Sequence, residues 1–276
     1  MTAAVRVIAV VGMVREARII AGDGVLTVIG GGDSAGLERK LEEALADLSL
    51  PVSRSDTGEV ARRERAVTEG VSPRAQASSA AGSDGPPPDP PFFEQGSRME
   101  KPLLLSFGVC GALVPGLEAG DLLIASEVIA DGHVHAVDAD WTAHLAAALP
   151  KARLAPITAG EAMIGSVAGK RALFEATGAA AVDMESHIVA RVAQRHALPF
   201  AAIRAVSDAA DHALPAAALA GLRPDGQPDI GAVLWSLAKR PGQLPALLRT
   251  AREAGLGFKS LEDAKARLSR ALATAG

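Results

Sequence analysis

The stretch that decides the fold is VLTVIGGGDSAGLERKLEEALADL, residues 25–48. Val25 to Ile29 is a continuous apolar run, which predicts a strand that is buried on both faces. Three glycines then permit a tight turn, and Asp33 or Ser34 can cap a following helix by accepting from the amides of its first turn. Leucines recur at helical spacing on one face of residues 37–48, with Glu and Lys on the other. The stretch therefore predicts a strand, a glycine turn and a helix.

The same alternation of strand and helix continues on both sides of this stretch. Apolar runs predict further strands at residues 5–11, 103–107, 122–125, 179–182 and 200–206. Ser186 to His196 has the spacing and composition of a helix. Strands that alternate with helices indicate an α/β sheet that is covered by helices on both faces.

Residues 51–101 break this pattern. They contain an Arg-rich run at 62–65, an Ala/Ser-rich run at 77–82 and a Pro-rich run at 86–91. Such a composition cannot bury enough apolar surface to offset the cost of ordering its backbone. We predict one domain over residues 1–276, interrupted by a mostly disordered insertion at about 51–101. A Pro-rich arm that binds a partner is the alternative.

Composition and charge exclude several classes of protein. The chain has 28 Lys and Arg against 32 Asp and Glu, so its net charge of −4 gives no basic footprint for nucleic acid. A single Cys excludes a disulfide framework and a multi-thiolate metal site. No apolar run is long enough to cross a membrane, and the apolar run at 7–14 ends in Arg15 and Glu16 without a cleavage site, which favours a strand over a signal peptide. We expect a soluble, cytoplasmic protein with no metal and no other cofactor.

Two local patterns suggest sites but have simpler interpretations. Gly30, Gly32 and Ala35 match the loose G-x-G-x-x-A pattern of dinucleotide sites, but the acidic residue that should follow would fall at the entrance of the insertion. A tight turn without a cofactor is therefore favoured. Cys110, in the segment 108–112, resembles a nucleophile elbow that follows a strand. A thiol hydrolase would need a nearby His, and none has diagnostic spacing, so a small buried Cys is favoured.

A pair of histidines is a third candidate. His133 and His135 would share one face of an extended segment, with Asp131 and Asp138 close in sequence. This set could bind a metal, but no third ligand is placed, so a polar loop after a strand is the favoured interpretation.

Three acidic residues stand near predicted strand ends. Glu16 follows the strand that ends at Gly12, Glu185 opens the helix at 186–196, and Asp208 follows the strand at 200–206. Ligands of α/β sheets bind at the carboxyl ends of strands, so these acids could face one pocket. The pattern alone slightly favours a simpler role, in which Glu185 and Asp208 stabilise helix N-termini.

Three segments together resemble the nucleoside phosphorylase and nucleosidase superfamily. They are VVGMVRE at 10–16, SFGVCGAL at 106–113 with AGDLLI at 119–124, and AVDME at 181–185 with RAVSD at 204–208. The glycines at 30–32 also match the glycine-rich turn of the superfamily, which replaces the dinucleotide interpretation. The resemblance implies a three-layer α/β/α sandwich with a mixed central sheet, a nucleoside substrate and a homo-oligomer.

A narrower resemblance lies near the end of the chain. The segments LPAAAL at 214–219, LRPDGQPD at 222–229 and KRPGQLP at 239–245 resemble the hopanoid-associated phosphorylase branch. Members of that branch remove adenine from adenosylhopane, a pentacyclic lipid joined to adenosine. The resemblance implies an adenosylated lipid as substrate and a place in hopanoid biosynthesis. A purine nucleoside phosphorylase, a methylthioadenosine or S-adenosylhomocysteine nucleosidase, a thiol hydrolase and a non-catalytic carrier stay as alternatives.

The resemblance assigns catalytic and binding roles by position. Asp208 is the acid that protonates purine N7, and Glu16 is the base that holds the attacking water. Glu185 accepts hydrogen bonds from the ribose hydroxyls, and Met163 and Ile164 cover the purine face.

The matched motifs add four substrate-binding positions: Met184, Ser207, Gly111 and Val109. Val109 stands where related enzymes often carry a Ser or Thr that contacts phosphate or ribose. Arg15 and Arg18 lie near the position of the phosphorylases' arginines but do not match it clearly. Both departures favour water over phosphate as the nucleophile.

The last part of the chain predicts amphipathic helices. One covers about 229–239 and includes Trp235, and another covers about 243–253. Basic residues between 239 and 252 could contact anionic lipid headgroups, which would allow peripheral membrane contact. The simpler interpretation is that both apolar stripes pack on the sheet. The segment 260–263 predicts a capped start of a last helix.

Overall fold

The strand and helix predicted in residues 25–48 form in the computed structural model, which describes residues 5–31, 33–48, 101–221, 223 and 227–274. β2 spans Val25–Ile29, and α2 spans Ser34–Asp47. Asp33 is the N-cap of α2, and its side chain accepts from the Gly36 amide at 3.0 Å. That bond satisfies one of the free donors of the first turn. The predicted insertion lies outside the described residues except for Lys101, so it stays a prediction.

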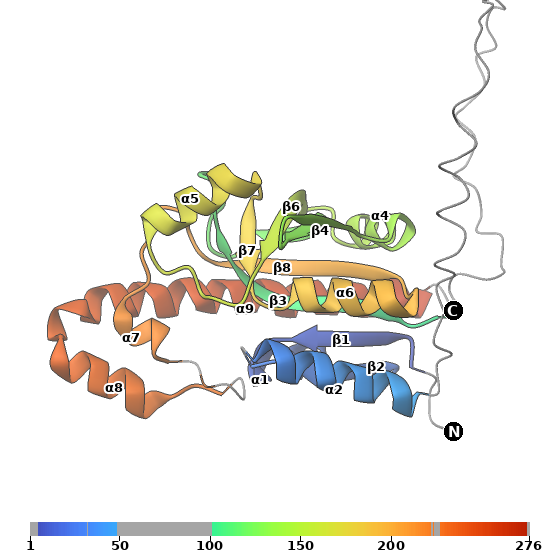
Figure 1. The fold of residues 1–276 in the computed structure, drawn as a ribbon, viewed down its shortest axis with the longest axis horizontal. Helices are drawn as coiled ribbons and strands as arrows, with labels where there is room; N and C mark the ends of the chain where they lie inside the picture. The colour runs from blue at the N-terminus through green and yellow to red at the C-terminus, as the bar shows by residue number, and fades with distance from the viewer. Residues whose placement is uncertain (1–4, 32, 49–100, 222, 224–226, 275–276) are drawn as a thin grey trace, which may run out of the picture. The chain divides into compact units, whose positions relative to one another are not determined.

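The other elements alternate between strand and helix, as predicted (Figure 1). In chain order they are β1 (Val7–Val11), α1 (Val14–Ile20), β3 (Leu103–Ala112), β4 (Leu122–Ala130), β5 (His133–Ala136), α4 (Ala139–Ala148), β6 (Arg153–Ala159), α5 (Val167–Thr177), β7 (Ala181–Asp183), α6 (Ser186–His196), β8 (Phe200–Asp208), α7 (Ala216–Leu219), α8 (Ile230–Lys239), η1 (Pro241–Gln243) and α9 (Leu244–Thr274). None of the helices that the structure describes has the length and apolar character to span a bilayer.

The strands of the described residues pair into one mixed sheet. The order is β2-β1-β3-β7-β6-β4-β5, and β8 pairs with both β3 and β4. β3 runs parallel to β1 and β8 and antiparallel to β7, while β4 runs antiparallel to β5 and β8. The pairings of β3, β7, β6, β4 and β8 therefore close a ring. This arrangement brings the carboxyl ends of β3, β7 and β8 to one place.

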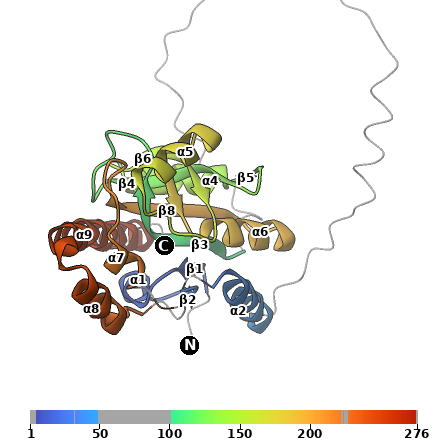
Figure 2. The same ribbon diagram turned by 60° about the vertical axis from the view of Figure 1, so that its left-hand side comes forward.

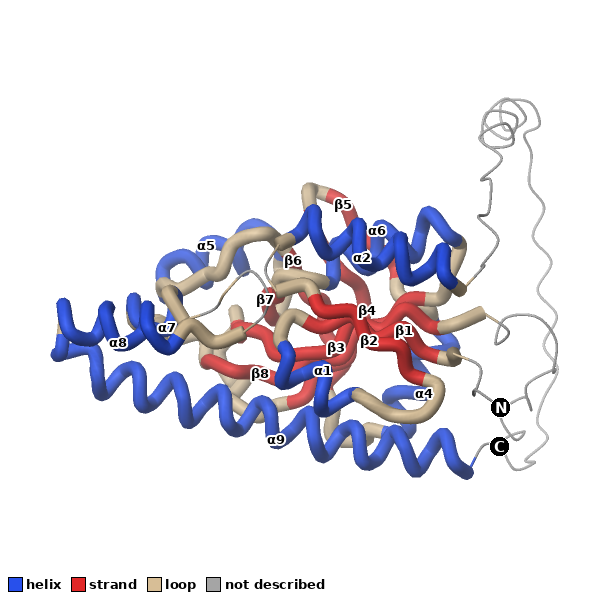
Figure 3. Tube along the Cα trace, turned by 90° about the horizontal axis from the view of Figure 1, so that it is seen from below, coloured by secondary structure: helices blue, strands red, loops and turns tan. Residues whose placement is uncertain are grey.

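Helices cover both faces of the sheet, which confirms the predicted three layers. Figure 3 shows α2 and α6 above the strands and α1, α4 and α9 below them. Figure 2 also separates the pair α2 and α6 from the pair α1 and α9, with β1 and β3 between them. Alternate residues of β1 point to opposite faces of the sheet. Ile8 and Val10 pack with the leucines of α2, and Val7 and Ala9 pack with the C-terminal half of α9.

β3 is longer than the strand predicted at 103–107 and continues to Ala112, so no elbow forms at 108–112. Glycine has a different purpose there. A Cβ on Gly108 would lie 2.5 Å from Glu16 Oε1 and 2.7 Å from an Arg204 nitrogen. Gly108 therefore lets two side chains approach the strand closely. Between Cys110 and Gly111 the register with β8 shifts, which is the signature of a bulge.

The predicted helix start at Ser260 is also wrong, since residues 260–263 lie inside α9. The Ser260 hydroxyl donates to the Gly120 carbonyl at 2.6 Å, so the Ser contributes a tertiary bond instead of a cap. Leu261 is fully buried, which continues the apolar stripe that Phe258 begins.

The expectation that both tail stripes pack on the sheet does not hold. α8 begins after the Asp229 cap, close to the predicted boundary, but none of its residues is buried. Val233 and Leu237 are half-buried, and α8 packs against α7 and η1. In α9, Leu244 and Leu248 stay exposed, and burial begins only near Phe258.

Candidate active site

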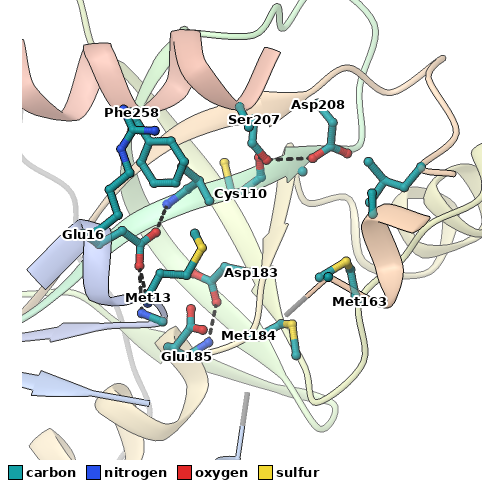
Figure 4. A pocket seen from close by; sticks show the side chains of 18 of the residues that line it. Met13, Glu16, Cys110, Met163, Asp183, Met184, Glu185, Ser207, Asp208 and Phe258 are labelled. Atoms are coloured by element: carbon teal, nitrogen blue, oxygen red, sulfur yellow. Dashed lines mark hydrogen bonds between the residues drawn. The ribbon is translucent and has the colours of Figure 1, made fainter. Parts of the chain in front are cut away.

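A cavity of about 810 Å³ opens at the carboxyl ends of β1, β3, β7 and β8. All nine predicted site residues line it: Glu16, Val109, Gly111, Met163, Ile164, Met184, Glu185, Ser207 and Asp208. Figure 4 shows several of these side chains converging, with Glu16 and Asp208 at different sides of the cavity. The structure therefore brings the predicted set together, and the roles of its members stay predictions.

Glu16 is held almost rigidly by the main chain. It lies in the first turn of α1 and is only 1% exposed. Its Oε2 accepts from the amides of Gly12 at 2.9 Å and Met13 at 2.8 Å, and its Oε1 accepts from the amide of Val109 at 2.8 Å. A carboxylate has about four acceptor positions, so one remains, on Oε1. Burial raises the pKa of Glu16, and Arg204 and the three amides oppose that rise.

Asp208 is the last residue of β8 and has a cationic partner. Lys170, from α5, is fully buried, and its Nζ lies 2.5 Å from Asp208 Oδ2. The same ammonium donates to the carbonyls of Ala209 at 2.7 Å and His212 at 3.0 Å, which uses all three of its donors. The Ser207 hydroxyl lies 2.7 Å from Oδ1. The carboxylate of Asp208 is thus fixed from two sides.

Glu185 is the N-cap of α6, although its side chain does not cap that helix. A Cβ on Gly12 would lie 2.5 Å from Glu185 Oε1, so this carboxylate rests against the same turn that holds Glu16. Burial raises the pKa of Glu185 to about 7; the cation of Arg204 opposes the rise, and the charges of Asp183 and Glu16 add to it. Glu185 therefore changes its charge near neutral pH.

Arg204 lies beneath these acids and is fully buried. Its guanidinium is 2.6 Å from Asp183 Oδ2 and 3.3 Å from Glu185 Oε2. The Nε–H does not point along the short Asp183 contact, so we describe that contact as an ion pair and not as a hydrogen bond. A terminal nitrogen donates to the Ser106 hydroxyl at 2.5 Å. One cation thus serves a cluster of buried carboxylates, which could not all stay ionised without it.

Sequence reasoning did not single out Arg204, Asp183 or Lys170 as site residues. A signal existed for Arg204, because it is the charged residue inside the apolar run at 200–206. A charge at such a position needs a buried partner. Lys170 carries no comparable signal, since α5 has other basic and acidic residues on its exposed face.

The remaining lining is mostly apolar. Met163 and Ile164 come from the loop between β6 and α5, and Met184 from the turn before α6. Phe258 enters from α9, which the sequence did not predict, and the Arg15 guanidinium lies 4.1 Å from the centre of its ring. Arg15 and Arg18 both line the cavity. The site therefore joins a group of acids to a large apolar wall.

The thiol interpretation of Cys110 finds no support in this geometry. Cys110 lies within β3 and is 3% exposed, and burial raises the pKa of its thiol. A thiol is a poor nucleophile unless it is ionised. No histidine is among the described residues that line the cavity. His133 and His135 lie on β5, and no group of three or more His, Cys, Asp or Glu side chains in the described residues could hold a metal ion.

Acids at the carboxyl ends of strands, beneath an apolar wall, define a small-molecule site of an α/β protein. A family model described as "Phosphorylase superfamily" matches residues 97–237, slightly more than half of the chain. The chain belongs to this superfamily. No curated protein sequence matches it.

Solved structures show the same fold. The 5′-methylthioadenosine/S-adenosyl homocysteine nucleosidase of Helicobacter pylori is 16% identical, with a TM-score of 0.51, over 95% of this chain and 98% of that one. The S-adenosylhomocysteine nucleosidase of Streptococcus pyogenes, in complex with 5-methylthiotubericidin, is 13% identical, with a TM-score of 0.50, over 94% of this chain and 97% of that one. These likenesses confirm the predicted fold class, and they do not address the hopanoid-associated branch.

Proposed function

We propose that the protein cleaves the N-glycosidic bond of an adenosylated lipid such as adenosylhopane, in hopanoid biosynthesis. Adenine and a ribosyl-lipid would be released, with water as the nucleophile. The observation that carries the chemistry is the placement of Glu16 and Asp208 at different sides of one cavity, with Glu185 beside Glu16. The lipid comes from the resemblance of residues 214–245 to the hopanoid-associated branch, and the nucleosidase class agrees with the two similar structures.

The leaving purine needs a proton, because cleavage moves the electron pair of the C1′–N9 bond onto the base. In the proposed reaction Asp208, which is ion-paired with Lys170 in the free protein, takes a proton from solvent water as the purine binds and passes it to purine N7. Lys170 and Ser207 fix the carboxyl group, so its direction is set before the substrate arrives. General acid catalysis of this kind contributes about 10²–10⁴-fold to a rate.

The sugar that remains is an oxocarbenium-like cation, and the water must reach its opposite face. Glu16 would hold this water at its one remaining acceptor position and take its proton as the C1′–O bond forms. The raised pKa of Glu16 suits a base that must accept a proton near neutral pH. Glu185, once ionised, accepts from the ribose hydroxyls and stabilises the positive charge on the ring. The proton that Glu16 takes balances the proton that Asp208 gives.

The size of the cavity supports a substrate larger than a bare nucleoside. Small-molecule sites generally enclose about 300–1,000 Å³, and this one reaches about 810 Å³. The wall formed by Met163, Met184 and Phe258 offers apolar surface beyond the acids. An adenosine that carries an apolar 5′ group would fill both parts.

Adenine release from adenosylhopane and from 5′-alkylthioadenosines of rising chain length tests the proposal. We expect release without phosphate, lost by at least about 100-fold in Asp208→Asn and kept in Cys110→Ala. Loss in Cys110→Ala alone would support the thiol hydrolase. Binding without release by the wild type would support the carrier. Activity confined to methylthioadenosine and S-adenosylhomocysteine would favour that nucleosidase class and refute the lipid.

Phosphorolysis is the second candidate, and one observation favours it. Arg15 and Arg18 both line the cavity, where guanidinium groups could bind a phosphate. Arg15, however, already stacks on Phe258 and lies 3.8 Å from Glu262. Identification of the sugar product decides between the two: a strict phosphate requirement and a ribose 1-phosphate-type product would overturn hydrolysis.

A further inference from the structure

The segment from Ile230 to Arg252, which comprises α8, η1 and the start of α9, presents apolar side chains to the outside. We call it the α8–α9 hairpin. Trp235 is 65% exposed, Leu234 is 60% exposed and Leu248 is 61% exposed. Ile230 and Leu244 are exposed as well, and α8 buries none of its residues. Figure 1 shows α8 beside α7 and the first turns of α9, apart from the sheet. A cluster of large exposed apolar side chains marks an interaction surface.

The charge of this hairpin differs from that of the rest of the chain. It contains Lys239, Arg240, Arg249 and Arg252 and no Asp or Glu, while the whole chain has a net charge of −4. All four basic residues are exposed. The Lys239 ammonium lies 4.7 Å from the centre of the Trp235 ring, so a cation and an aromatic side chain share one spot on the surface.

We propose that the α8–α9 hairpin docks on an anionic lipid bilayer. An interfacial helix buries Trp and Leu at the level of the headgroups, while Lys and Arg contact the anionic lipids around it. A second copy of the chain is a poorer fit. A two-fold contact through this surface would gather eight Lys and Arg side chains in one interface, with no Asp or Glu of either hairpin to pair with them.

Docking by this surface would place the cavity next to the bilayer. The cavity is lined by residues from each part of this region: Ala218 of α7, Gly221 after α7, Pro228 before α8, and Thr250 and Ala254 of α9. The proposal thus extends the proposed function by naming where the protein meets a lipid substrate. It does not depend on catalysis, because binding to vesicles is measured without any substrate.

Two tryptophans allow a direct test. Trp141, on α4, is half-buried and packs against the core, whereas Trp235 is exposed. In Trp141→Phe the emission reports on Trp235 alone. We expect a blue shift, and quenching by brominated acyl chains, with vesicles of phosphatidylcholine and phosphatidylglycerol in equal parts. Phosphatidylcholine vesicles should give little change, and added salt should reverse the binding.

Flotation with the same vesicles separates the apolar and basic contributions. The pair Leu234→Ser and Trp235→Ser, and the set Arg240→Gln, Arg249→Gln and Arg252→Gln, should each weaken partitioning by about tenfold or more. The control for the apolar pair is Val134→Ser with Leu154→Ser, whose side chains are 62% and 59% exposed on β5 and β6. The control for the basic set is Arg39→Gln with Arg171→Gln, at exposed positions of α2 and α5. The controls should bind as the wild type does.

Three results would overturn the proposal. The first is that the wild type does not bind anionic vesicles at low salt. The second is that the hairpin variants and the controls bind equally. The third is that the wild type binds no vesicles but forms a dimer in sedimentation velocity, and that the double variant Leu234→Ser with Trp235→Ser is a monomer. The proposed function is judged separately, since short 5′-alkylthioadenosines that stay in water should be cleaved equally by the hairpin variants and the wild type. Vesicle binding without any adenine release would refute the proposed function alone.

Discussion

Lys170→Met is the substitution that best tests how the site is held together. Met has a similar length and no charge, so it fills the space of Lys170 and removes its three donated hydrogen bonds. Asp208 then keeps a buried charge without its cation, and two carbonyl groups, those of Ala209 and His212, lose their donor. Because Lys170 is fully buried, water cannot easily replace the lost partner.

The expected cost follows from this burial. Removal of one partner from a buried ion pair destabilises a protein by about 3–5 kcal/mol. A domain of this size loses about 2–4 °C in Tm for each kcal/mol, so calorimetry should show a fall of at least about 6 °C. We also expect kcat to fall much more than KM rises, because Asp208 loses its direction while the rest of the cavity is unchanged. Lys259→Met, at an exposed position of α9, is the control and should melt as the wild type does.

A double-mutant cycle with Asp208→Asn decides whether Lys170 acts through Asp208. The neutral amide needs no cation, so Lys170→Met should cost about 1–3 kcal/mol less in that background. Equal costs in both backgrounds would refute the reasoning, since Lys170 would then stabilise only the loop at 209–212. A wild-type melting temperature in Lys170→Met would refute the stabilising pair itself.

Three further expectations follow from the acids and glycines of the site. Since the pKa of Glu185 is about 7, kcat/KM should rise with pH through that value, and Glu185→Gln should lose this limb; an unchanged profile would exclude Glu185 as its source. The same pKa lies above the ordinary value of 4.5, so between these two pH values the folded state keeps a proton that the unfolded state releases. The free energy of unfolding of the wild type, relative to that of Glu185→Gln, should therefore fall as pH rises from about 4.5 to about 7, which urea titrations can measure. Gly108→Ala should lower the free energy of unfolding by at least about 1–3 kcal/mol and abolish activity, because its Cβ would overlap Glu16. Gly255→Ala, at a position of α9 with open space around it, should instead raise the free energy of unfolding by up to about 1 kcal/mol. Similar effects of the two substitutions would contradict the packing argument.

Local signals accounted for most of the fold. The cap at Asp33 and the leucine spacing after it predicted α2, and the composition of residues 186–196 predicted α6 with its observed bounds. The strand ends drew attention to the acids, because strand ends of a sheet of this type meet at one edge, but this pattern alone slightly favoured a role at helix N-termini, and the resemblance to the superfamily gave the acids their site roles. These features need no knowledge of distant contacts.

The errors have a common physical origin in long-range contacts. The strand at 103–107 was predicted to end where its glycines begin, but β3 continues to Ala112, and the side chains that need the space at Gly108, those of Glu16 and Arg204, come from distant parts of the chain. Ser260 was predicted as a cap from the local pattern at 260–263, but its hydroxyl bonds to Gly120, which is 140 positions away in the sequence. Lys170 was missed because its role depends on Asp208, which lies on another element. A pattern confined to one segment carries no information about such partners.

Helix α9 extends from the α8–α9 hairpin to the cavity. Phe258 of α9 lines the cavity, and Leu248 of the same helix lies exposed in the α8–α9 hairpin, ten residues earlier. At about 1.5 Å per residue these positions are about 15 Å apart along the helix. A docked hairpin would therefore leave about 15 Å of helix between its contact with the bilayer and Phe258, and the nucleoside of a lipid substrate would have to leave the interface to reach the cavity. The apolar wall of Met163, Met184 and Phe258 then has a physical purpose, because it covers the part of the lipid that rises out of the bilayer and offsets the cost of exposing that part to water.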